Sequence, residues 1–226
     1  MKKELYLTGG ITDQKAFSNV KERLQHDVGM LINLVLKEKQ INSDLVAPFW
    51  AFARMLFPVA ESIGDLIYRG SSSDNLVNLF KNDLSKYNEN YAKVAGLVTL
   101  MYRHSLTHQD EMRSLMDENT RCYGWGLGFA NTLSHLEILD LDRGRSIPVT
   151  IQFDLGQFYD DLLRVLDDKL KDDFCGKAGR RYEEWKLCWL PQDDENITKI
   201  ERLALQEAAS LHKGWSSRVV YPKIEY

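Results

Sequence analysis

Residues 44–69, DLVAPFWAFARMLFPVAESIGDLIYR, contain the most apolar stretch of the chain and decide its fold class. The stretch follows Asn42 and Ser43 and begins at Asp44, all residue types that favour a helix N-terminus. Apolar residues cover most of the predicted helix, and a helix that is apolar on most sides is buried. We therefore expect this segment to be the central helix of a bundle. Its polar residues lie on one narrow stripe: Arg54, Glu61, Asp65 and Arg69.

Further helices are predicted on both sides of this segment. Apolar residues recur at spacings of three and four, which is the period of an amphipathic helix. The expected helices span residues 17–40, 75–87, 91–107, 154–170, 177–188 and 196–211.

The pattern changes between residues 119 and 153. Residues 121–129 read RCYGWGLGF, in which glycines alternate with larger apolar residues, as in a strand that another segment approaches closely. Residues 133–139 and 147–153 are two more strand candidates, and residues 140–145 form a turn between them. We expect a small antiparallel β-meander inserted after the helix over residues 91–107.

The chain has no internal repeat and no long linker, so a single domain over residues 1–226 is the simplest organisation. Within it we distinguish a helical bundle core (17–118), the β-meander (119–153), and C-terminal helices with a tail (154–226). The expected fold class is mainly α.

The amino-acid composition argues against several classes of function. The 226 residues include 29 Lys and Arg against 33 Asp and Glu, a net charge of −4, which argues against a protein that coats nucleic acid by bulk charge. Lys81, Lys86, Lys93 and Arg113 could still make a basic patch. Three cysteines without a CxxC pair favour a reducing cytoplasm. No secretory signal and no apolar run long enough to span a membrane is found.

The best candidate for chemistry is residues 101–110, MYRHSLTHQD, at the end of a predicted apolar helix. His104 and His108 share a helix face and could bind a metal, but the known protease motif needs a glutamate where Ser105 stands. Alternatively, the histidines bond the last carbonyls of the helix and Arg103 pairs with a carboxylate. The third interpretation is chemistry directed at a phosphate.

This third interpretation comes with a resemblance. Residues 103–108, RHSLTH, resemble the Arg-x4-His motif of HEPN-like domains, in which the residue after the arginine is often Asn, Asp or His. The apolar helix that contains ARMLFP at residues 53–58 also resembles a helix of uncharacterised bacterial relatives. The resemblance covers residues 31–109 best and the rest of the chain only loosely.

The resemblance implies a metal-independent endoribonuclease or an RNA-binding protein that acts as a homodimer, so that two motifs line one cleft. His108 would be the general acid or base, Arg103 would hold phosphate oxygens, and His104 would orient them. RNA and a neutralising protein are then the expected partners, and no metal or cofactor is expected. The alternative is a non-catalytic helical interaction module in which Arg103 and His108 only cap a helix or organise a dimer.

Two sets of acidic residues are interpreted as structural. Asp160, Asp161, Asp167 and Asp168 follow a spacing of seven, which predicts the solvated face of a helix. Glu61 and Asp65, on the polar stripe of the buried helix, are expected to pair with Arg54, Arg69 or Arg103.

Overall fold

The computed structural model describes residues 10–41, 49–103, 114–118, 121–129, 133–140, 149–186, 198, 200, 202–204 and 206–207. These residues belong to two compact units, Met1–Glu183 and Glu184–Tyr226, and each unit is described by itself. The single domain expected from the sequence stays a prediction. None of the helices within the described ranges is both long and apolar enough to cross a membrane.

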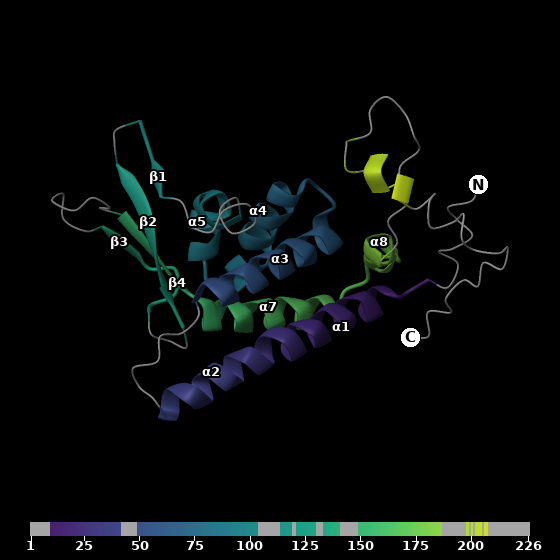
Figure 1. The fold of residues 1–226 in the computed structure, drawn as a ribbon, viewed down its shortest axis with the longest axis horizontal. Coiled ribbons are helices and arrows are strands. Elements are labelled where there is room, and N and C mark those ends of the chain that lie inside the picture. The colour runs from purple at the N-terminus through teal and green to yellow at the C-terminus, as the bar shows by residue number, and fades with distance from the viewer. Residues whose placement is uncertain are drawn as a thin grey trace. The chain divides into compact units, whose positions relative to one another are not determined.

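The first unit opens with one long helical run (Figure 1). It comprises α1 (Asp13–Arg23), the π-helical η2 (Leu24–Gly29) and α2 (Met30–Ile41). Thr12 caps the run, because its side chain accepts a hydrogen bond from the Lys15 N–H at 3.1 Å. From Phe17 on, the inward positions recur every three or four residues, which confirms the helix predicted from its apolar period: Phe17, Val20, Leu24, Val28 and Ile32.

The segment that decided the fold class is α3 (Phe49–Tyr68), and it is the central helix as predicted. It packs against α1, η2, α4 and α7. The helix continues through Pro58, which lies on the exposed stripe beside Arg54, where water can replace the bond that proline cannot donate. Its buried hydrophobic residues are Phe52, Ala53, Leu56, Phe57, Ala60, Ile63 and Leu66.

Most other predicted helices are confirmed within the described residues. They are α4 (Ser72–Asn82) with the 3-10 turn η3 (Leu84–Lys86), α5 (Asn90–Val98) with the π-helical η4 (Thr99–Arg103), α7 (Leu155–Lys169) and α8 (Lys177–Lys186). In the second unit, Ile200, 202–204 and 206–207 are helical, and the Arg202 N–H donates to the Thr198 carbonyl at 3.0 Å. The rest of the helix predicted over 196–211 lies outside the described residues.

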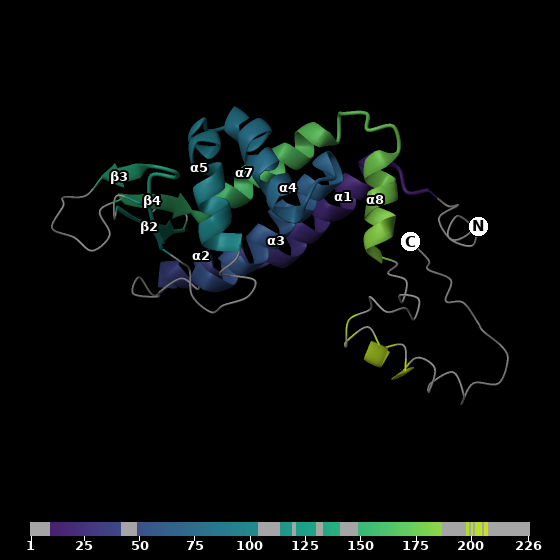
Figure 2. The same ribbon diagram turned by 90° about the horizontal axis from the view of Figure 1, so that it is seen from above.

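The sheet differs from the prediction. Its four strands are β1 (Leu115–Met116), β2 (Cys122–Gly128), β3 (Ile138–Asp140) and β4 (Val149–Asp154), in the order β1-β2-β4-β3. β2 and β4 are parallel, whereas β1 pairs with β2 and β3 pairs with β4 in antiparallel fashion. The antiparallel meander was therefore wrong: the small sheet is mixed, and β4 inserts between β2 and β3. Figure 2 shows β2, β3 and β4 at one end of the helices.

The segment between β2 and β3 shows why the strand predicted over residues 133–139 is shortened to Ile138–Asp140. A turn closes where the Glu137 N–H donates to the Ser134 carbonyl at 3.0 Å, and Leu136 has a φ of 63°, so residues 133–137 do not extend into a strand. Leu133 instead covers β2, since a Cβ on Gly128 would lie 2.6 Å from the Leu133 Cγ. The glycines of β2 permit close approach as predicted, but the approaching group is a loop side chain.

Two glycines offer a test of the packing between α3 and α4. A Cβ on Gly64 would lie 2.6 Å from the Asn75 backbone oxygen of α4, whereas a Cβ on the exposed Gly96 of α5 would meet nothing within 4 Å. Gly64→Ala should lower the free energy of unfolding by about 1–3 kcal/mol, because backbone must move. Gly96→Ala should raise it by about 1 kcal/mol, since alanine is the better helix former. Urea denaturation measures both, and equal effects would contradict the close approach.

Candidate functional site

The Arg-x4-His motif begins at the end of the helical run α5–η4. Tyr91, Val94, Val98 and Met101 anchor this run in the core, and the backbone changes from α- to π-helical at Thr99. Arg103 is the last residue of η4. His104 and His108 lie outside the described residues, so the proximity of these three residues stays a prediction.

The cations expected near the motif are partly neutralised. The Lys93 Nζ lies 2.6 Å from a Glu89 carboxylate oxygen, and the Lys86 Nζ lies 3.3 Å from an Asp83 oxygen. Lys81 is exposed on α4. Arg113 lies outside the described residues. The α4–α5 region therefore offers less positive charge than a count of its lysines suggests.

A polar chain that the sequence did not reveal links the buried Tyr91 of α5 and the buried Asp161 of α7 to the half-buried His135. The His135 Nε2 lies 2.7 Å from the Tyr91 hydroxyl, and that hydroxyl donates to the Asp161 carboxylate at 3.1 Å. The other ring nitrogen of His135, Nδ1, accepts the backbone N–H of Asp154 at 3.0 Å. His135, in the turn before β3, thus contacts residues from α5 and the end of β4, and Tyr91 links it to α7.

These contacts fix the tautomer of His135. Its Nδ1 must be the unprotonated nitrogen because it accepts an N–H, so Nε2 carries the proton and donates to Tyr91. Burial lowers the pKa of His135 to about 4, which keeps the ring neutral at physiological pH. Burial, reinforced by the negative charge of Asp161, raises the pKa of Tyr91 well above its ordinary value, so the phenol stays protonated.

Asp161 contradicts the prediction of a solvated carboxylate face on α7. Its exposed fraction is 1%, and its carboxylate also accepts from the Gln157 amide at 3.0 Å and the Arg164 guanidinium at 3.2 Å. Burial raises the pKa of Asp161, while the bonds from Gln157 and Tyr91 and the charge of Arg164 oppose that shift. The repeat of seven was correct as a helical spacing, but it could not distinguish the buried position.

The hydrogen-bonded chain of His135, Tyr91 and Asp161 suits a structural role. Each of its protons is directed at a neighbour, and the His135 ring packs against Tyr91 and Phe153 with centroids 5.2 and 4.9 Å away. Asp154 adds a second link, because its side chain caps α7 by accepting the Gln157 N–H at 3.0 Å. The cluster fixes α7 to the end of β4, and we assign it a structural role.

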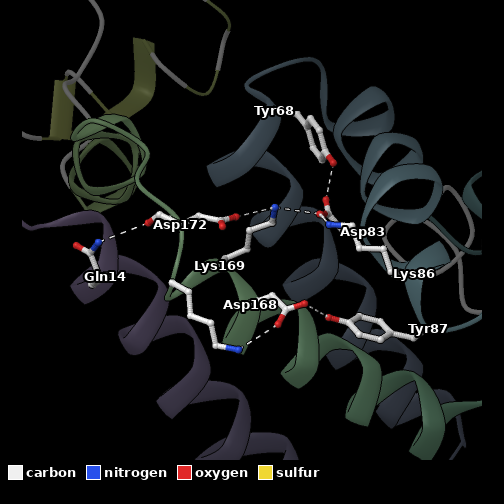
Figure 3. A network of polar contacts seen from close by, with 9 residues as sticks. Gln14, Tyr68, Asp83, Lys86, Tyr87, Asp168, Lys169 and Asp172 are labelled. Atoms are coloured by element: carbon white, nitrogen blue, oxygen red, sulfur yellow. Dashed lines mark hydrogen bonds and ion pairs between the residues drawn. The ribbon is translucent and has the colours of Figure 1, made fainter.

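A second polar network joins α3, α4 and α7 (Figure 3). The buried Asp83 accepts from the Tyr68 hydroxyl and lies 3.0 Å from the Lys169 Nζ. Burial would lower the pKa of Lys169, but Asp83 and Asp172 outweigh it and raise the pKa. Nearby, the Tyr87 hydroxyl donates to Asp168 at 2.7 Å and lowers the pKa of that carboxyl. These carboxylates are committed to partners on neighbouring helices.

Asp65 has a partner that the sequence did not indicate. Its carboxylate takes two bonds from the Arg181 guanidinium, from Nε at 2.7 Å and from Nη2 at 3.0 Å, and one from the Asn75 amide at 3.0 Å. Asp13 holds the start of the same helix, α8, because it accepts the N–H groups of Gly176 and Gly179 at 2.8 and 2.7 Å. Both acids attach α8 to the bundle.

No three His, Cys, Asp or Glu side chains gather as a metal site in the part of the chain that the structure describes. Comparisons with protein-family models, with curated proteins and with solved structures gave no match.

The half-buried His135 generates a pH prediction. The unfolded histidine takes up a proton near pH 6.5 and the folded one near pH 4, so acidification across this window favours the unfolded state. His135 should therefore remove up to about 3 kcal/mol of unfolding free energy between pH 7 and pH 4. His135→Gln should be less stable at pH 7 by about 1–3 kcal/mol and should show a flatter pH dependence.

Urea denaturation at several pH values measures this effect, with Met116→Gln, at an exposed residue of β1 that does not titrate, as the control. The control should keep the slope of the parent protein. A His135→Gln variant with the parent's slope would show that another group carries the pH dependence.

Proposed function

We propose that this protein is a HEPN-like metal-independent endoribonuclease or RNA-binding protein that acts as a homodimer in the cytoplasm. Its site would consist of Arg103, His104 and His108. The single observation that carries the proposal is the position of Arg103: it ends a core-anchored helical run inside a mainly helical fold. The resemblance to HEPN-like domains implies that the arginine of the Arg-x4-His motif lies in such a helix.

The local backbone adds support. The run turns π-helical at Thr99, whose hydroxyl donates to the Ala95 carbonyl at 2.8 Å. Single π-helical turns are frequent at functional sites because they change the direction in which side chains project. Rigid core contacts before Arg103 would give the site a fixed base.

The chemistry follows from the residue types. The RNA 2′-hydroxyl would be the internal nucleophile, and His108 would exchange protons with it or with the leaving oxygen. The guanidinium of Arg103 would bind two phosphate oxygens and stabilise the charge that develops on them. His104 would orient the other two, and a neutralising protein would be a natural partner for such an activity.

A second function, a non-catalytic interaction module, is favoured by one observation. Met30 and Leu34 of α2 are 59% and 53% exposed, and neighbouring apolar residues exposed in this way mark contact surfaces. In that case Arg103 and His108 would cap a helix or organise a dimer.

The two functions are separated by His108→Ala. Under the first, cleavage of a labelled single-stranded RNA in EDTA should fall by at least about 100-fold, because the proton-transfer group is lost. The circular dichroism spectrum and the oligomeric state should not change. Gel analysis of the RNA over time measures the rate.

His26→Ala, at an exposed histidine of η2, is the matched control and should cleave at the parent's rate. Equal cleavage by His108→Ala and the parent would remove His108 from the mechanism. A parent protein that neither cleaves nor binds RNA would favour the interaction module.

A further inference from the structure

α8 buries little apolar surface. Among the side chains of residues 177–185, those of Ala178 and Tyr182 are buried. The preceding helix, α7, buries a full apolar face: Leu155, Phe158, Leu162, Val165 and Leu166. The apolar area that becomes exposed sets most of the free-energy cost of detaching a helix, so α8 should detach far more easily than α7.

Polar contacts attach α8 to residues 11–13, at the start of α1. The Asp13 carboxylate accepts the N–H groups of Gly176 and Gly179. The Glu183 carboxylate accepts the Ile11 N–H at 2.9 Å. A Cβ on Gly179 would lie 1.8 Å from the Ile11 carbonyl oxygen, so the two backbones are in direct contact. The contact at this end of α8 thus involves backbone and carboxylate groups.

The end of α3 supplies a second attachment. The Arg181 side chain, which is 37% exposed, donates two bonds to the Asp65 carboxylate. The Arg69 guanidinium donates to the Lys177 carbonyl. Arg69 makes this bond from a φ of 58°, a left-handed conformation that is strained for a residue with a side chain. The bond therefore contributes less free energy than the same bond from a relaxed backbone.

Contacts of this kind can be exchanged for contacts with water. Backbone N–H groups, carboxylates and guanidinium groups are hydrated when they separate, so each bond contributes little net free energy. We propose that α8 is a releasable strap, which undocks from α1 and α3 as one piece while the rest of the first unit stays folded.

The place of α8 in the chain gives this motion a consequence. The boundary between the two compact units falls after Glu183, inside α8, so the helix is the covalent link to Glu184–Tyr226. Undocking adds residues 177–183 to the link and lengthens its reach. The docked and undocked forms of α8 are thus two states of the connection between the units. The inference goes beyond the proposed function and does not rest on it.

Hydrogen exchange of the full chain, followed by NMR, tests the strap. The amides of Ile11 and Gly179 should exchange at least about tenfold faster than those of Ile63 and Leu66 in α3, because they open without global unfolding. Low urea concentrations should hardly change the faster rates, since undocking exposes little surface. Equal rates with equal urea dependence in the two sets would overturn the proposal.

A substitution in the second attachment tests whether α8 moves as one piece. Arg181→Gln removes the charged bonds to Asp65 and should speed the exchange of Ile11 and Gly179 by one common factor, about tenfold. Lys177→Gln is the control, because it removes a positive charge from the same helix at an exposed side chain that takes no part in these contacts. Unchanged exchange of Ile11 and Gly179 in Arg181→Gln, or equal acceleration by Lys177→Gln, would contradict the strap.

A distant substitution separates undocking from unfolding. His135→Gln destabilises the joint of α5, β4 and α7, which stays intact when α8 undocks. It should speed the exchange of Ile63 and Leu66 and leave Gly179 at the parent's rate. If Gly179 instead accelerates by the same factor as Ile63 and Leu66, α8 opens only when the whole unit unfolds and the proposal fails.

Discussion

The free energy that holds this protein together comes mainly from covering α3, a helix that is apolar over most of its circumference. The long α1–α2 run, α4 and α7 each contribute one apolar face to it. The sheet region reaches the same helix through aromatic contacts: Phe52 stacks on Phe129, the residue after β2, at 4.9 Å, and Phe57 packs against Phe153 of β4 at 5.6 Å. The other elements are therefore arranged around a single helix whose exposed stripe is narrow.

Helix positions could be predicted from the sequence because the signal is local. The inward residues of α1 and η2, from Phe17 to Val28, recur with the helical period, and the run of apolar residues in α3 needed no other information. Strand order could not be predicted in this way. Three short strands with a turn between them fit a meander as well as a mixed sheet, and no local pattern reports the parallel pairing of β2 with β4, which joins residues far apart in the chain.

The candidate site also combines features that local sequence predicts with features that it does not. A motif such as Arg103-x4-His108 is read from consecutive residues, and so is the helix that carries its arginine. The His135–Tyr91–Asp161 chain could not be found this way, because its members are 44 and 70 residues apart and none stands in a recognisable motif. Asp161 was even expected in water, since a charge repeat reports helical spacing but says nothing about which neighbour covers a given turn.

The inner position of β4 has a consequence for synthesis on the ribosome. The hairpin of β1 and β2 can pair as soon as it emerges, but β3 has no strand beside it until Val149–Asp154 arrives. The parallel edge of β2 stays open for the same interval. During translation, some twenty residues must leave the exit tunnel while the backbone groups at the open edge of β2 have no hydrogen-bond partners. The nascent chain is thus most open to wrong pairing just before α7 is made.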